Sequence, residues 1–203
     1  MKKATRLIFF SFALLLSACA STQIEESWTL PGYTPASPQK VMVVALAGSE
    51  TMREAFENAF VKQLEALGVS AVQSKRWLPD STKVDKEALR PILVQNSITT
   101  VLISSIRGVE KDRTFQPAEQ IGPTDNLFRN FDTYQVYDSS GQHETGSYVE
   151  TTEYLLETNL FNTKTEKLSW SVTTRTAQTK DMKSGVDSVV SAVINQATDD
   201  NVF

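Results

Sequence analysis

Apolar and polar positions from residue 40 onward follow patterns that predict strands and helices in turn. Residues 41–47 form a continuous, valine-rich apolar run, which is typical of a strand buried on both faces. The pattern Thr51-x-x-Glu54 then favours the start of a helix. Apolar residues recur after it at intervals of three and four: Met52, Phe56, Ala59, Phe60, Leu64 and Leu67. Gly68 ends this helix and residues 69–73 alternate as a second strand, which predicts a βαβ unit with parallel strands.

The rest of the chain predicts a run of strands closed by a helix. The pattern indicates a helix at 85–96, strands at 100–109, 131–137, 148–161 and 167–176, and a helix at 185–197. Strand 167–176 alternates most clearly and turns Leu168, Trp170 and Val172 toward the core. The order β-α-β-α-β-β-β-β-α predicts a single α/β (α+β) domain, a mixed sheet with helices packed on it.

The last predicted helix has one apolar face that should lie on the sheet. This face consists of Val186, Val189, Val190, Val193, Ile194 and Ala197. The helix is followed by Asp199 and Asp200, which put negative charge at the negative pole of the helix. We therefore expect its C-terminal end to fray.

Residues 110–130 obey no period, which predicts a long loop. A loop of this length in a compact domain is either functional or lacks fixed structure. Its apolar side chains could pack back on the domain or contact a partner. The candidate partner contacts are Phe115, Ile121, Leu127 and Phe128.

The first nineteen residues have the pattern of an export signal. Three basic residues precede an apolar run of about ten residues, too short for the roughly twenty that span a bilayer. The tetrapeptide that ends at Cys19, Leu-Ser-Ala-Cys, resembles the lipobox of bacterial lipoproteins. This resemblance implies cleavage after Ala18, a diacylglyceryl group on the Cys19 thiol and an acyl group on the new amine. The alternative is an ordinary secretory peptide that happens to end near a cysteine.

The lipobox implies where the protein works. Residues 1–18 would be a cleaved signal peptide, and two or more acyl chains on Cys19 would anchor the chain in a membrane. The next residue is Ala20 rather than aspartate, and by resemblance to lipoprotein sorting patterns this implies the outer membrane of a Gram-negative bacterium, on its periplasmic face. Residues 19–39 contain glycine and several prolines and predict a lipidated N-terminus with a flexible tether, ahead of the domain at 40–203. Three roles are open for Trp28 in this tether: it could dock on the domain, contact a partner or simply be exposed to solvent.

Charge and residue types exclude several functions. Without the leader, 17 basic residues face 24 acidic ones, a net charge of about −7 that disfavours nucleic acid and anionic lipid as partners. One histidine, His143, and one cysteine cannot form a zinc site, and no phosphate-binding glycine motif occurs, so we predict no catalytic, metal or cofactor site. A carboxylate pair, Glu150 with Glu157 or Asp132, leaves a cell-wall glycan hydrolase as the alternative.

Several motifs resemble a group of bacterial lipoproteins of unknown function. They are Ser27-Trp28 with Tyr33, Phe56-Glu57, Gly68-Val69, Val101-Leu102-Ile103, and a hairpin with Glu157-Thr158-Asn159-Leu160-Phe161 and Lys167-Leu168-Ser169-Trp170-Ser171. The element order is also similar to the small α/β domain of the curli-secretion lipoprotein, the penicillin-binding-protein activator lipoprotein and the Tol-system β-propeller protein. The resemblance implies a scaffold for protein contacts without a catalytic set. We therefore expect a non-enzymatic outer-membrane lipoprotein, attached through Cys19, that binds an unidentified envelope protein.

Overall fold

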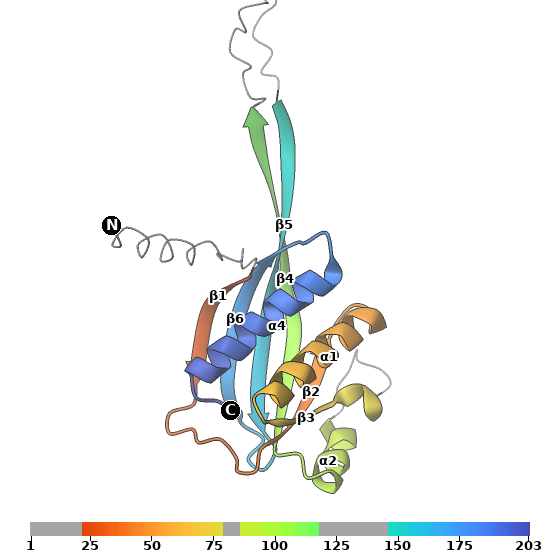
Figure 1. The fold of residues 1–203 in the computed structure, drawn as a ribbon, viewed down its shortest axis with the longest axis vertical. Helices are drawn as coiled ribbons and strands as arrows, with labels where there is room; N and C mark the ends of the chain where they lie inside the picture. Colours follow the sequence, from red (N-terminus) through yellow and green to blue (C-terminus); the bar gives the residue numbers. More distant parts are fainter. Residues whose placement is uncertain (1–21, 79–85, 118–145) are drawn as a thin grey trace, which may run out of the picture. The chain divides into compact units, whose positions relative to one another are not determined.

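Six strands form one mixed sheet in the order β1-β6-β5-β4-β2-β3 (Figure 1). The computed structural model describes residues 22–78, 86–117 and 146–203. Its elements are β1 (Thr22–Thr29), β2 (Lys40–Leu46), α1 (Glu50–Ala66), β3 (Ser70–Gln73), the 3-10 helix η1 (Ser74–Arg76), α2 (Lys86–Gln95), β4 (Thr100–Pro117), β5 (Gly146–Asn162), β6 (Leu168–Ala177) and α4 (Met182–Asp199). The chain forms two compact units, one of residues 1–109 with 153–203 and the other of residues 110–152. The fold class is α+β, as predicted.

The predicted βαβ unit is confirmed. Strand β2 pairs in parallel with β3 on one side and with β4 on the other, with Val43 opposite both Gln73 and Leu102. Helix α1 connects β2 to β3, and α2 lies between β3 and β4 in the chain. All of Val41 to Ala45 is buried, because helices cover both faces of this central strand.

The antiparallel half of the sheet contains one strand that was not predicted. The hairpin of β5 and β6 is confirmed, with Leu160 opposite Trp170. Strand β1 then pairs with the free edge of β6, with Thr22 opposite Thr176. The expectation of a flexible tether at 19–39 was therefore wrong for residues 22–29. The sequence pattern of this strand is weak because most of its side chains are exposed. Its backbone groups form hydrogen bonds with the edge of β6.

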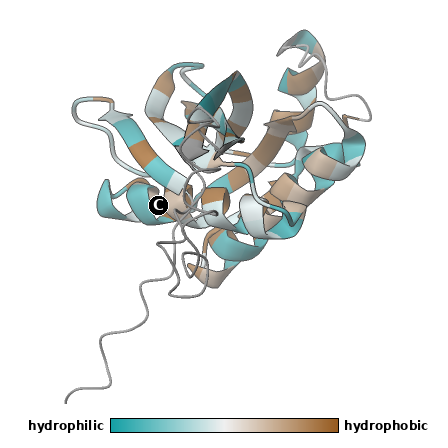
Figure 2. Ribbon diagram, turned by 90° about the horizontal axis from the view of Figure 1, so that it is seen from above, coloured by the Kyte–Doolittle hydropathy of each residue, from teal (hydrophilic) through white to brown (hydrophobic). Residues whose placement is uncertain are grey.

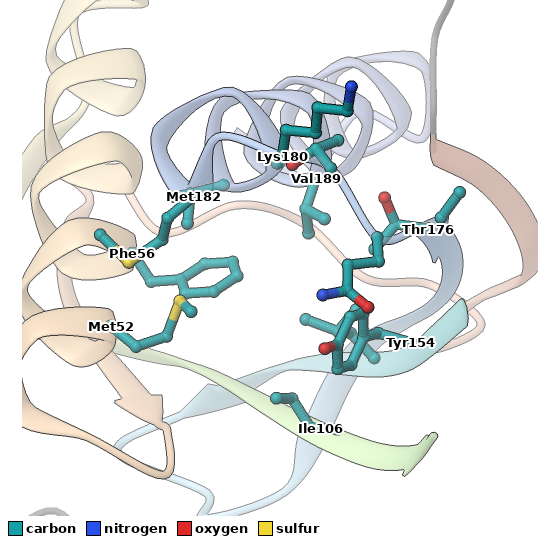
Figure 3. A pocket seen from close by; sticks show the side chains of 14 residues that line it. Met52, Phe56, Ile106, Tyr154, Thr176, Lys180, Met182 and Val189 are labelled. Carbon is teal, nitrogen blue, oxygen red and sulfur yellow. The ribbon is translucent and has the colours of Figure 1, made fainter. Parts of the chain in front are cut away.

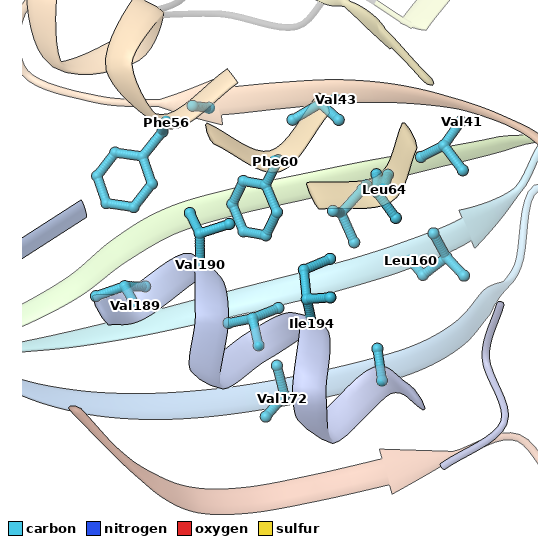
Figure 4. Packing of buried hydrophobic residues seen from close by; sticks show 14 of the residues in the cluster. Val41, Val43, Phe56, Phe60, Leu64, Leu160, Val172, Val189, Val190 and Ile194 are labelled. Atoms are coloured by element: carbon cyan, nitrogen blue, oxygen red, sulfur yellow. The ribbon is translucent and has the colours of Figure 1, made fainter. Parts of the chain in front are cut away.

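Two helices cover one face of the sheet and form the main core (Figure 4). Phe56, Phe60 and Leu64 of α1 and the predicted apolar face of α4 meet the strands there, and all six residues of that α4 face are buried. A smaller cluster beneath α2 fills the other face of β2 with Met42 and Val44. Figure 2 shows hydrophilic residues on the sides of the helices that are turned away from the sheet. No helix among residues 22–78, 86–117 and 146–203 is long and apolar enough to cross a membrane.

The ends of two helices differ from the predictions. Helix α1 is capped by Ser49, whose Oγ accepts from the Met52 amide at 3.2 Å, and the predicted Thr51 already lies inside the helix. The C-terminal end of α4 does not fray: the helix reaches Asp199, and the carboxylate of Asp200 accepts hydrogen bonds from three side chains. These hydrogen bonds stabilise the negative charge of Asp200, which the negative end of the helix dipole would destabilise.

The long predicted loop is a strand for part of its length. Strand β4 continues to Pro117, so residues 110–117 are extended backbone and Phe115 lies on a strand. The remainder of that predicted loop and the predicted strand at 131–137 fall outside the described residues.

Candidate functional site

A groove with apolar walls opens between α1 and α4, above strands β4, β5 and β6 (Figure 3). Its volume is about 280 Å³. Phe56 from α1, Leu156 from β5, and Val186 and Val189 from α4 are buried and line its interior. Helical periodicity brings Phe56 and Val189 to the sheet, and alternation along β5 turns Leu156 to the same side.

The mouth of the groove exposes large apolar side chains. Ile106 of β4 is 41% exposed and Met182, the first residue of α4, is 42% exposed. Met52 also lines the groove, so two of the four methionines of the chain lie here. Methionine adapts its shape to different apolar ligands, and exposed apolar side chains that surround a hollow mark a binding site.

The chemistry of the lining favours binding over catalysis. Lys180, Thr179 and Gln178 supply the polar groups near the groove, with the phenol of Tyr154 on the strand side. The groove is about twice the size of an engineered cavity of roughly 150 Å³ that binds benzene. It therefore suits a slender apolar ligand.

Strand β1 begins beside this groove. The Thr22 hydroxyl lies 2.8 Å from that of Thr176, which lines the groove, and 2.9 Å from that of Ser188 on α4. Thr22 is buried by these contacts. The described residues therefore begin three positions after Cys19, which itself lies outside them.

A second cavity, of about 780 Å³, lies between α2 and the ends of β4 and β5. Leu93, Val94 and Phe161 are among its apolar lining residues. At its rim, Arg90 forms ion pairs with Glu87 at 3.0 Å and with Glu166 at 2.9 Å. These carboxylates raise the pKa of the Arg90 guanidinium above its already high value, and Glu166 contributes most.

A fully buried ion pair lies at the start of α1. Arg53 Nε and Glu57 Oε1 are 3.0 Å apart, and both side chains have no exposed surface. The Ser74 hydroxyl donates to Glu57 at 2.6 Å, and the guanidinium of Arg53 donates to the Leu78 carbonyl at 2.6 Å. The pair thus fastens η1 to α1, and its saturated hydrogen bonding is typical of a structural role. In the sequence, only the spacing of four residues within a predicted helix signals this pair.

Two of the three carboxylates that suggested a hydrolase, Glu157 and Glu150, lie beside basic residues. Glu157 is paired with Arg107 at 2.6 Å. Glu150, in the 110–152 unit, lies 3.8 Å from Lys111 and 4.0 Å from Arg113. Asp132 and His143 lie outside the described residues. Within the described ranges, no group of three or more His, Cys, Asp or Glu side chains is placed to hold a metal ion.

One of the predicted partner contacts, Phe115, can be located. Its ring packs edge-on against Tyr148 with centroids 5.3 Å apart, and the guanidinium of Arg113 lies 6.0 Å from the Tyr148 ring centroid. Ile121, Leu127 and Phe128 fall in the undescribed part of the chain. Trp28, for which three roles were open, is 41% exposed on β1 opposite Ser171.

Comparisons with known proteins give similarities in fold only. No family model and no curated protein sequence matches the chain. Among solved structures, the PelC dodecamer from Paraburkholderia phytofirmans is similar at 11% identity and a TM-score of 0.47, over 85% of this chain and 94% of that one. Lipoprotein GNA1162 from Neisseria meningitidis is similar at 14% identity and a TM-score of 0.42, over 80% and 99%. A protein described as a neuraminyllactose-binding hemagglutinin homolog from Helicobacter pylori is similar at 11% identity and a TM-score of 0.44, over 83% and 88%. At such values the similarities carry no argument about function.

Proposed function

We propose that this protein is a lipoprotein of the outer membrane, anchored on the periplasmic face through acylated Cys19, which acts as a binding module for another envelope protein. The lipobox at Leu16 to Cys19 supports the anchor. The position of Thr22, which is buried and lies three residues after Cys19, supports a domain held close to the bilayer, because three residues reach about 10 Å at most.

The observation that carries the binding function is an aromatic pair in the 110–152 unit, half-buried Phe115 and exposed Tyr148. Tyr148 is 68% exposed although its ring packs against Phe115, and nearly every described side chain of this unit is exposed. Neighbouring strands β4 and β5 contribute the described residues. A two-stranded ribbon is at best marginally stable alone. Further contacts would therefore stabilise this one, and tyrosine and arginine are the residues that dominate protein interfaces.

The alternative of a glycan hydrolase receives no support from the described carboxylates. A retaining or inverting hydrolase needs two carboxyl groups that converge on one bond. Glu157 and Glu150 each lie beside basic side chains instead. The binding function is therefore the one that we propose.

Crosslinking in intact envelopes followed by recovery of the native lipoprotein tests this proposal. We expect a specific envelope protein to be recovered with the wild type and lost when Tyr148→Ala and Arg113→Ala are combined. Leu67→Ala is the matched control, since Leu67 is an exposed apolar residue of the other unit. Equal recovery with the Tyr148/Arg113 variant and the control would contradict a binding role for the ribbon.

A further inference from the structure

The groove between α1 and α4 presents apolar surface to water in the described structure. Ile106 and Met182 at its mouth are each more than two-fifths exposed, while Phe56 and Val189 in its interior are buried. Apolar surface in a concave site favours an apolar occupant, because filling the site removes that surface from water. The occupant should therefore be an apolar group that can reach the groove mouth.

Thr22 lies beside the wall of this groove. Its hydroxyl lies 2.8 Å from the hydroxyl of Thr176, a residue of the groove wall. Cys19 precedes Thr22 by three residues, and three residues of chain span about 10 Å at most. An acyl chain extends by about 15 Å, half the thickness of a bilayer hydrocarbon core. An acyl chain on Cys19 is thus long enough to enter the groove.

We infer that the groove holds one of the acyl chains carried by Cys19. This inference rests on the proposed lipidation of Cys19. Covalent attachment keeps the chain at high effective concentration beside the groove. A chain that moves from the bilayer into the groove exchanges one apolar environment for another, since lipid tails are about as apolar as leucine. The groove lining gains contacts, and the bilayer closes behind the chain.

The shape and residues of the groove fit this occupant. Its volume of about 280 Å³ lies near the lower limit for small-molecule sites, as expected for a slender chain. Met52 and Met182 can adjust their conformations to a flexible aliphatic ligand. Occupation would leave the remaining acyl chains of Cys19 in the membrane and would hold the start of β1 and the start of α4 at the bilayer surface.

A photocrosslinking experiment in cells labelled with radioactive palmitate tests the inference. A benzoylphenylalanine replaces Ile106 at the mouth of the groove, and in a control it replaces Leu67, which is also exposed but does not line the groove. After irradiation and proteolysis, we expect palmitate label on the peptide that contains position 106, joined to the N-terminal peptide. The control position should carry none.

A second variant and the anchor mutant make the outcome decisive. Met182→Glu places a negative charge at the mouth of the groove, so it should abolish most of the crosslink. Because an acidic residue is favourable in the first turn of a helix, the melting temperature should stay unchanged. If the N-terminal peptide is labelled but position 106 is not, the groove does not hold the anchor. If position 106 is labelled equally in Cys19→Ala, the occupant is a membrane phospholipid and the inference is overturned. Absence of label from the N-terminal peptide of the wild type would instead contradict the proposed lipoprotein function itself.

Discussion

The indole Nε1 of Trp170 donates a hydrogen bond of 2.8 Å to Oδ2 of Asp200. Ser27 on β1 donates to the same oxygen, and Gln196 donates to Oδ1 at 3.0 Å. One carboxylate therefore joins β6, β1 and the end of α4. Burial alone would raise the pKa of Asp200, but these three hydrogen bonds outweigh it and hold the pKa below its usual value.

Trp170→Ala should be among the most destabilising single substitutions in the core. The side chain is fully buried, and truncation of a large buried aromatic costs about 3 to 5 kcal/mol. Denaturant melts of residues 19–203 carrying Cys19→Ser, which removes the proposed lipid acceptor, would measure this cost. Trp28→Ala is the matched control on the neighbouring strand and should cost clearly less, since Trp28 is 41% exposed whereas Trp170 has no exposed surface. Equal costs at the two positions would mean that Trp170 is not a core residue.

Asp200 should make stability depend on acid pH. A carboxyl group whose pKa is lower in the folded state stabilises that state at pH values above the unfolded pKa, near 4. This contribution is lost as the pH falls from about 4 through the lower pKa of the folded state. Urea melts of wild type and Asp200→Asn should therefore differ most at neutral pH and converge at the acid end.

The matched control for this pH dependence is Asp199→Asn. Asp199 is an exposed neighbour, so its replacement should leave the acid dependence of the wild type intact. A stability difference between wild type and Asp200→Asn that stays constant from neutral to acid pH would contradict the account.

Glu57→Ala should destabilise the fold strongly because it removes the buried carboxylate beside the fully buried Arg53 guanidinium and leaves it only the half-exposed Glu50, 3.6 Å away. Breaking a buried ion pair on one side costs about 3 to 5 kcal/mol. The exposed pair formed by Arg90 and Glu87 offers a comparison, and Glu87→Ala should cost about 1 kcal/mol or less. Both costs can be measured in the same denaturant melts.

The double variant Arg53→Met with Glu57→Leu separates the effect of a buried guanidinium that has lost Glu57 from the effect of lost packing. We expect it to be clearly more stable than Glu57→Ala, because no buried charge remains. If the double variant is no more stable than Glu57→Ala, the hydrogen bonds to Ser74 and Leu78, rather than the charge pair, fasten η1 to α1.

Sequence patterns predicted the elements whose burial is periodic. The apolar face of α4 was predicted residue by residue, and in β6 the prediction is confirmed for Trp170 and Val172, because these side chains meet the core. Leu168 was also expected to face the core but is only partly buried, next to a register shift in the pairing of β5 with β6. Strand β1 was missed since it has a single buried residue, Thr22, and is held by the backbone of β6. Its formation depends on a partner strand far away in the chain, which no local pattern reports.

The candidate site could not be predicted for a similar reason. The groove is lined from α1, β4, β5, β6 and α4, so no local stretch contains its pattern. Phe56 and Val189 were predicted only as core positions of their helices. The hydrogen bond from Ser27 to Asp200 joins residues that are 173 positions apart in the sequence, so no local pattern predicts it either. Phe115 was predicted as a contact residue, although on a loop rather than on a strand.

Lipid attachment at Cys19 can be tested by mass spectrometry of the N-terminal peptide of the native protein, purified from envelopes. We expect a mature chain that begins at Cys19 and carries a diacylglyceryl group on its thiol and a further acyl group on its amine. Recovery of the protein in the outer-membrane fraction should accompany this mass. An unmodified Cys19, or a mature chain that begins at another residue, would contradict it.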